Sequence, residues 1–226
     1  MTLSERYRQH RGRAIADWVR QVPEEFQAWE LTTLARDEFN REAIEKLEGL
    51  VDELENVFKK GINLVLSGKV GVGKTALAWA FARAIVGAPA IAWGADPIQR
   101  WERLREDGAD PINRVAFWSL RELVRSEQRD IDRETKVAPL DSAKRAEFLF
   151  LDDVGVRGTT TDSAQGYLFE LLDYRYTKHL PTFVTTNLPL AQGKESKLDP
   201  AIVDRLTATS RTVMRSLLGD SRRRSR

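Results

Sequence analysis

The chain has 226 residues, a net charge of +2 and 42% hydrophobic residues, which suffices for one substantial core and a small appendage. It contains no cysteine and two histidines, so disulfides and cysteine-based metal sites are excluded and little remains for a zinc centre. No apolar segment is long enough to span a bilayer and the first residues are too polar for a signal peptide, so we expect a cytoplasmic protein with no membrane contact.

Basic residues gather at the two ends of the chain. They are Arg6, Arg8, Arg11 and Arg13 at one end and Arg222, Arg223, Arg224 and Arg226 at the other. Such clusters favour contact with nucleic acid phosphates. The alternative is a solvated arm and a solvated tail.

Two helices are predicted before the first strand. The first is basic, covers residues 1–22 and ends at Pro23. Its apolar side consists of Ile15, Trp18, Val19 and Val22. From Phe39 to Phe58 the apolar residues again follow helical spacing, and Gly61 ends this second helix.

Strands and helices then alternate along the chain. An apolar strand over 62–67 precedes a glycine-rich loop and a helix from about 75 to 86. Residues 88–113 resemble an insertion that contains a helix start, DPIQRWERL. The remaining predicted elements are the strand RVAFWS, the helix LRELVRSEQ, a polar stretch, the strand EFLFLDDVG, a helix over 163–179, the strand TFVTTN and the strand RTVMRSLL. This pattern predicts an α/β fold with a five-stranded parallel sheet flanked by helices.

The loop GKVGVGKT, from Gly68 to Thr75, matches the phosphate-binding pattern G-x-x-x-x-G-K-[ST]. Its backbone N–H groups would surround a phosphate, and the following helix would direct its positive dipole end at the anion. Lys74 would reach the β and γ phosphates, and the Thr75 hydroxyl would bind Mg²⁺. We therefore predict a P-loop NTPase that binds ATP through Gly68, Gly71, Val72, Gly73, Lys74, Thr75 and Ala76.

Polar residues follow two other strands at the edge where ligands bind in parallel sheets. Asp152 is predicted to support Mg²⁺ from the end of an adjacent strand, and Asp153 to orient and partly deprotonate the attacking water. Either acid could instead cap the turn that follows. Asn187, at the tip of the fourth strand, is predicted to hold the water near the γ phosphate, with an Asx turn before Pro189 as the alternative.

The order of LVLSGKVGVGKTALA, FLFLDDVG, LFELLDYRY, PTFVTTNLP and IVDRLT resembles the AAA+ ATPases of the DnaC/IstB group. That group contains bacterial and phage helicase loaders and the ATPase helpers of some transposons. The resemblance covers residues 37–226. The phosphate loop alone is unspecific, but TTNLP followed by DRL at this separation is quite specific.

The resemblance implies a role for each matched residue in ATP hydrolysis. Lys74 and Thr75 become the phosphate and Mg²⁺ residues, Asp152 the acid associated with Mg²⁺, and Asp153 the acid that activates water. Many members of the broader class carry Glu at the position of Asp153, and the shorter Asp is a departure from that pattern.

The resemblance also implies an assembly. Asn187 becomes sensor one, Arg205 the finger that reaches the γ phosphate of a neighbouring subunit, and Arg223 the sensor-two arginine of the closing motif GDSRR. ATP would lie between subunits of a ring or spiral that holds single-stranded DNA. Possible DNA contacts are Arg121, Arg125, Arg129 and Lys136, with a solvated basic helix as the equal alternative.

Two regions depart from the family's larger members. Residues 1–36 form a short basic segment that either binds a partner through its apolar side or packs back on the ATPase domain, which we place at 37–226. Trp93 and Trp101 in the insertion form either a contact surface or local core.

We therefore expect a Mg²⁺-dependent ATP hydrolase that assembles on single-stranded DNA and delivers a replicative helicase in DNA replication. The alternative is a transposition helper that assembles on target DNA and recruits a transposase. A third class is a binding module in which ATP serves assembly with negligible turnover. A small-molecule kinase is disfavoured, because the DRL and TTN motifs have no task in it.

Overall fold

The computed structural model describes residues 19–20, 22–88, 115–130, 139–155, 161–188, 197–208 and 210–221. No helix in these ranges is long and apolar enough to cross a membrane. The elements in chain order are η1 (Glu24–Phe26), α2 (Arg41–Asp52), α3 (Leu54–Lys60), β1 (Asn63–Gly68), α4 (Lys74–Gly87), β2 (Val115–Ser119), α6 (Leu120–Asp130), α7 (Pro139–Arg145), β3 (Phe148–Val154), α8 (Asp162–Thr177), β4 (Thr182–Thr186), α9 (Pro200–Thr207) and β5 (Thr212–Leu217).

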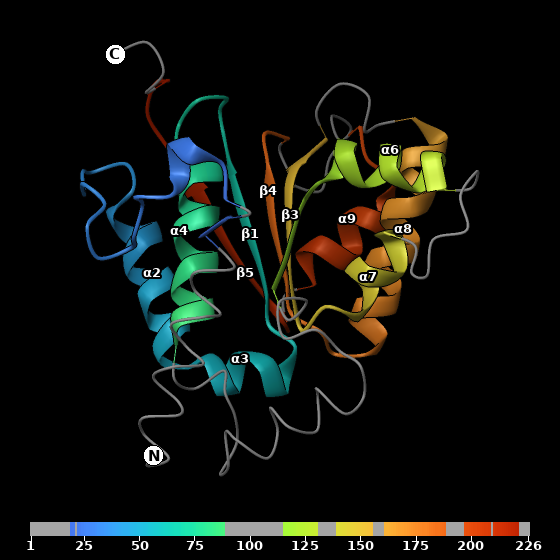
Figure 1. Ribbon diagram of the computed structural model, residues 1–226, viewed down its shortest axis with the longest axis horizontal. Coiled ribbons are helices and arrows are strands. Elements are labelled where there is room, and N and C mark those ends of the chain that lie inside the picture. The colour runs from blue at the N-terminus through green and yellow to red at the C-terminus, as the bar shows by residue number, and fades with distance from the viewer. Residues whose placement is uncertain are drawn as a thin grey trace.

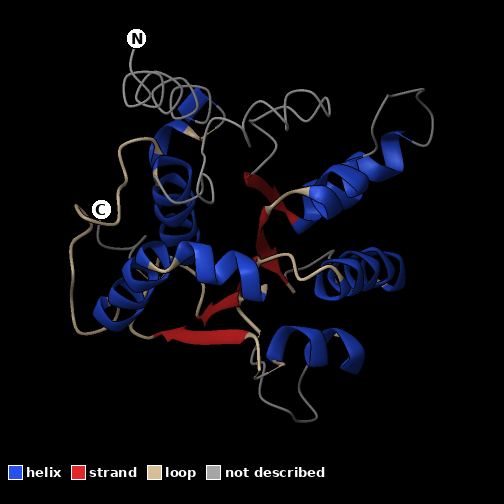
Figure 2. Ribbon diagram, turned by 90° about the horizontal axis from the view of Figure 1, so that it is seen from below, coloured by secondary structure: helices blue, strands red, loops and turns tan. Residues whose placement is uncertain are grey.

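The five strands form one parallel sheet in the order β2-β3-β4-β1-β5. Helices α2 and α4 lie on one side of the sheet, and α6, α7, α8 and α9 lie on the other (Figure 1). The view in Figure 2 shows the strands as a middle layer between these two groups of helices. The predicted fold class, a parallel five-stranded sheet flanked by helices, is confirmed.

Alternate residues of β1 and β3 enter different cores, because successive side chains point to opposite faces of a sheet. Leu64 and Leu66 belong to the cluster that includes the residues of α2 and α4, whereas Val65 belongs to the cluster with α8 and α9. Phe150 and Leu151 divide in the same way. β1 and β3 read as apolar over most of their length because each of their faces is covered, whereas the edge strand β5 is partly exposed.

The helix predicted over residues 39–58 is two helices. α2 ends at Asp52, Glu53 has φ −100° and ψ 24°, and α3 starts at Leu54. The predicted stop at Gly61 is confirmed: this residue has φ 61°, and a Cβ there would lie 2.6 Å from the carbonyl oxygen of His179.

Two helices were missed by the sequence analysis. α7 lies in the stretch read as polar; it has seven residues, of which Leu140 and Ala143 are buried, too few to produce a periodic pattern. α9 is also short, but Asp199 accepts a hydrogen bond from the Ala201 N–H, and Pro200 follows the cap. α8 ends at Thr177, two residues before its predicted end.

The segment before α2 packs on the same core as α4. Val22 is 7% exposed and Leu31 is 4% exposed, and the two belong to the cluster on the α4 side of the sheet. Val22 therefore contributes to the ATPase core and not to a free apolar face. Residues 1–18 and 21 of the predicted basic helix, and Trp93 and Trp101 of the insertion, lie outside the described residues.

Candidate functional site

The loop between β1 and α4 depends on three glycines with positive φ. Gly68, Gly71 and Gly73 have φ values of 151°, 87° and 101°, which an L side chain rarely adopts. A Cβ at Gly68 would lie 2.5 Å from the Leu217 carbonyl oxygen, and one at Gly71 would lie 2.1 Å from Ser221 Oγ. The end of β5 and the segment after it therefore pack directly against the loop.

Lys74 lies inside this loop as a buried cation. Its side chain is 7% exposed, and its Nζ donates hydrogen bonds to the carbonyl oxygens of Gly68 and Lys69, each at 2.9 Å. Lys74 is also the first residue of α4, a helix of 14 residues. A buried ammonium group and a helix N-terminus thus meet at one loop, which is the chemistry that binds phosphate.

Thr75 and Asp152 join the loop to β3. Thr75 Oγ1 donates to Asp152 at 2.9 Å from Oδ2 and 3.2 Å from Oδ1. Because the Thr75 proton points at the carboxylate, the lone pairs of its oxygen remain available to a cation. Burial raises the pKa of Asp152, and the hydrogen bonds from Thr185 and Thr75 oppose this rise.

These two residues fit Mg²⁺ as it binds with nucleotides. The described residues contain no group of three or more His, Cys, Asp or Glu side chains that could hold a metal. Mg²⁺ is typically bound by one or two protein oxygens, with phosphate and water as the other ligands. Thr75 and Asp152 would hold it in that manner, and the cation would offset the buried negative charge.

The strand that carries Asp152 is not adjacent to β1, contrary to the sequence analysis. β4 lies between β1 and β3, because strand order follows tertiary pairing and not chain order. The residue that fills the intervening position is Thr185 of β4, whose hydroxyl donates a hydrogen bond to Asp152. The signal that could have found it is a run of threonines in a strand that is buried throughout.

Asp153 differs from its neighbour in exposure and in backbone. It is exposed, whereas Asp152 is 6% exposed. Its φ is 58°, an uncommon value for a residue other than glycine, and its N–H donates to Thr185 Oγ1 at 3.0 Å. The exposed carboxylate of Asp153 therefore lies directly beside Asp152, where a group that orients the attacking water is predicted.

Asn187 directly follows β4 and carries an unsatisfied polar atom. Its Oδ1 is buried and makes no hydrogen bond to any part of the chain that the structure describes. The turn is held instead by Thr186, whose hydroxyl accepts from the Leu188 N–H at 3.0 Å and donates to the Val154 carbonyl. The alternative of an Asx turn is therefore not needed, and an unsatisfied buried acceptor is what a residue that holds a water molecule would present.

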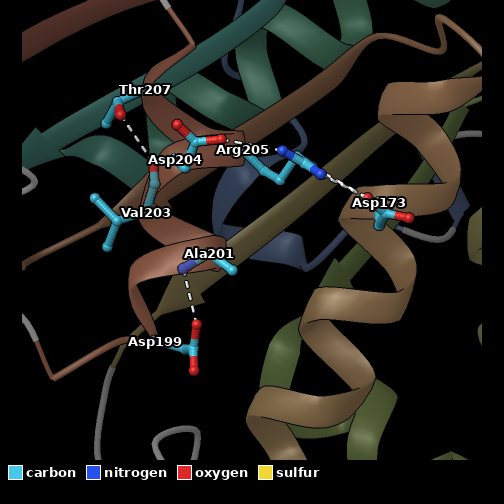
Figure 3. Close-up of polar contacts among 7 residues, drawn as sticks. All are labelled: Asp173, Asp199, Ala201, Val203, Asp204, Arg205 and Thr207. Carbon is cyan, nitrogen blue, oxygen red and sulfur yellow. Dashed lines mark hydrogen bonds and ion pairs between the residues drawn. The ribbon is translucent and has the colours of Figure 1, made fainter.

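Arg205 lies on α9 and points toward Asp173 of α8 (Figure 3). Its Nη2 and Nε contact Asp173 Oδ1 at 3.0 and 3.1 Å, and its Nη1 contacts Asp204 at 3.0 Å. The guanidinium also lies 4.9 Å from the centroid of the Tyr176 ring. The side chain is 30% exposed, so these contacts hold the arginine at the surface of the chain.

The other predicted site residues divide into three groups. Val72 and Ala76 are 2% and 4% exposed, so their side chains pack inside and their backbone alone is left for a ligand. Arg223 and Lys136 lie outside the described residues. The exposed arginines of α6 are Arg121, Arg125 and Arg129, which share one helix face at intervals of four residues.

Comparisons with known proteins identify the family and the fold of the chain. The model of the family described as IstB-like ATP binding protein matches residues 108–226. No curated protein matches the chain.

Solved structures match over most of the chain. The crystal structure of the DnaC helicase loader has a TM-score of 0.64 and 20% identity, covering 87% of this chain and 100% of that one. DnaI gives 0.61 and 24%, covering 89% and 94%. The replication initiator DnaA bound to AMPPCP and single-stranded DNA gives 0.60 and 17%, covering 88% and 51%. These likenesses confirm the AAA+ fold.

Proposed function

This chain belongs to the family of IstB-like ATP-binding proteins. From its likeness in fold to the DnaC helicase loader and to DnaI, we propose that it is an ATP-dependent loader that delivers a replicative helicase to single-stranded DNA. It is an ATPase of the AAA+ type. The observation that carries the ATPase part of the proposal is the hydrogen bond of Thr75 to Asp152, which joins the phosphate loop to the acid of β3. Mg²⁺ supplies charge neutralisation on the phosphates when it is bound.

The exposed acid of the site provides the test of hydrolysis. Asp153→Asn removes a base and keeps the shape, so ATP affinity should stay within about twofold while turnover falls at least about tenfold. Asp162→Asn, an exposed acid in the first turn of α8, is the matched control. Unchanged turnover in Asp153→Asn would favour the binding module, in which ATP serves assembly alone.

Arg205 is proposed to act on the nucleotide of a neighbouring subunit. In the single chain Asp173 binds its guanidinium, so action in trans exchanges this carboxylate for a phosphate. Mixing Arg205→Ala with Lys74→Ala protein should restore part of the ATPase activity, since mixed interfaces pair an intact loop with an intact finger. Arg211→Ala is the control, because Arg211 stacks on the same Tyr176 ring at 3.9 Å. No recovery in mixtures shown to co-assemble would indicate a role in cis.

Single-stranded DNA is proposed to bind along the basic face of α6. AMPPCP and single-stranded DNA occupy the DnaA structure of the same fold, which supports looking for nucleotide-dependent binding here. Replacing Arg121, Arg125 and Arg129 by alanine should lower the slope of log affinity against log salt by about 2, because each phosphate contact on a single strand contributes about 0.7. The control variant replaces Lys59, Lys60 and Lys178, which are exposed elsewhere. A slope equal to that of the control would exclude α6 as the DNA face.

The second candidate is a transposition helper, and the family match itself favours it. The two functions use the same ATPase, so the partner must decide between them. Tagged protein should copurify with the replicative helicase of its host when ATP is present. Stimulation of a transposase on target DNA, without helicase binding, would favour the second candidate.

Residues 1–18 are proposed to bind the replicative helicase. Deleting residues 1–18 tests this better than deleting 1–22, because Val22 is part of the core. The truncated protein should lose helicase binding and retain its ATP affinity. Retained helicase binding would move the contact elsewhere, with the insertion around Trp101 as the next candidate.

A further inference from the structure

The pairing of β3 with β4 changes register at the two candidate acids, Asp152 and Asp153. The register of β3 against β4 shifts between Leu151 and Val154, so that Asp152 and Asp153 together face Thr185 alone. A β-bulge of this kind bends a strand and redirects its side chains, and bulges are common beside active sites. The bulge explains how one residue of β4 contacts two consecutive acids.

One hydroxyl group serves both acids. Thr185 Oγ1 accepts a hydrogen bond from the Asp153 N–H at 3.0 Å and donates its proton to Asp152 Oδ1. Thr185 is 3% exposed, so solvent does not compete for these bonds. A hydroxyl has a single proton to donate, so the bond to Asp152 has a defined direction.

We propose that Thr185 is a positioning residue of the ATPase site. It fixes the position of Asp152, the acid proposed to support the cation, relative to Asp153, the acid proposed to orient the water. The roles of the two acids rest on the proposed function, whereas the contacts of Thr185 do not. The left-handed backbone of Asp153 needs a partner that holds it, and the Thr185 hydroxyl supplies one.

Thr185 differs from Thr75, the other hydroxyl on Asp152, in where it is anchored. Thr75 belongs to the loop that the nucleotide engages, and its oxygen is the one offered to the cation. Thr185 belongs to the middle strand of the sheet and has no such second task. Its bond therefore keeps Asp152 in place relative to the sheet when the loop changes its contacts.

Two substitutions separate the hydroxyl from the volume of the side chain. Thr185→Val keeps the shape and removes both hydrogen bonds, and Thr185→Ser keeps the hydroxyl. Mg²⁺ is expected to raise ATP affinity above the value measured in EDTA, and in the valine variant this ratio should be smaller by about tenfold or more. The kcat of the valine variant should fall by a similar factor. Serine should restore most of both.

A measurement without nucleotide tests the same contacts. Hydrogen exchange of the amides of residues 152–154 should be faster in the valine variant and close to the parent in the serine variant, because only valine removes the acceptor of the Asp153 N–H. Thr182→Val is the matched control, a buried threonine at the start of the same strand, and it should leave exchange at 152–154 and the Mg²⁺ effect unchanged.

The outcomes are distinct. Unchanged exchange in Thr185→Val, or equal impairment of the valine and serine variants, would overturn the proposal. If the parent protein does not hydrolyse ATP while valine accelerates exchange and serine does not, the proposed function fails and the positioning role holds.

Discussion

Two cations are buried among the described residues, and backbone carbonyls surround both. Lys74 donates to Gly68 and Lys69 at the carboxyl edge of the sheet. Arg175, on α8, is 1% exposed and lies at the opposite edge, where β3 and β4 begin. The same chemistry is found in the proposed ligand site at one edge and in a structural contact at the other.

The partners of the two cations differ in how easily they are exchanged. The carbonyls on Lys74 belong to a glycine loop that precedes a helix, and a phosphate can replace them. The acceptors of Arg175 connect α7, β3, α8 and β4; they are the carbonyl oxygens of Ala143, Lys144, Ala146, Glu147 and Pro181 and the hydroxyl of Thr182. Burial lowers the pKa of Arg175 to about 9, so the guanidinium remains charged at neutral pH.

The largest expected effect is the loss of stability when Arg175 is replaced. Arg175→Met should lower the free energy of unfolding by about 3 kcal/mol or more, because it leaves several buried carbonyls without donors. Chemical denaturation of the nucleotide-free protein measures this change, and the ATP affinity of the folded protein should stay within about twofold. Arg175→Lys keeps the charge but not the planar guanidinium group, so its free energy of unfolding should lie between those of the parent protein and Arg175→Met. A loss below about 1 kcal/mol would contradict the structural role.

Lys74→Ala should show the opposite pattern. It removes a charged contact with phosphate worth about 1.5–3 kcal/mol, so ATP affinity should fall at least about tenfold. The stability of the nucleotide-free protein should change by less than about 1 kcal/mol, since the loop carbonyls can turn to water. Fluorescence titration with a labelled nucleotide checks the affinity, with Lys60→Ala as an exposed control. Undiminished affinity in a folded variant would contradict the phosphate-loop assignment.

Asp152 should behave as the anionic counterpart of Lys74. Its pKa is raised in the folded protein, so the folded state holds a proton that the unfolded state loses, and stability falls as pH rises through that interval. Above the raised pKa the full penalty is present, so Asp152→Asn should there raise the Tm of the nucleotide-free protein, while hydrolysis is lost. The gain in Tm should disappear at a pH below the ordinary range of aspartate. An equal gain at both pH values would exclude desolvation of the carboxylate as its cause.

The smallest expected effect is at Thr182, which accepts from Arg175 Nε at 2.9 Å. Thr182→Val should lower the free energy of unfolding by about 1 kcal/mol and leave ATP affinity unchanged. A double-mutant cycle with Arg175→Met should show coupling, because the two residues share one hydrogen bond. If the effects of the two substitutions on the free energy of unfolding are strictly additive, the hydrogen bond between Arg175 and Thr182 contributes nothing to stability.

Much of the fold follows from local sequence patterns. The phosphate loop is readable because its glycines, lysine and threonine lie within eight consecutive positions of GKVGVGKT. The strands are readable because sheets covered on both faces need continuous apolar runs, and the alternation of strand and helix then predicts parallel pairing. Gly61 is readable as a helix end because the left-handed C-cap favours glycine.

The tertiary structure decided what depends on pairing between distant segments. That β4 lies between β1 and β3, and that two acids of β3 face Thr185 alone, is set by strand order and register, which no local pattern encodes. Arg175 reads as an ordinary helix arginine until the carbonyls of two other connections close around it. The sequence alone determined the groups that we propose to contact the nucleotide, because their spacing is local. The structure decided the groups that hold them in place, because those contacts form only when remote segments pack together.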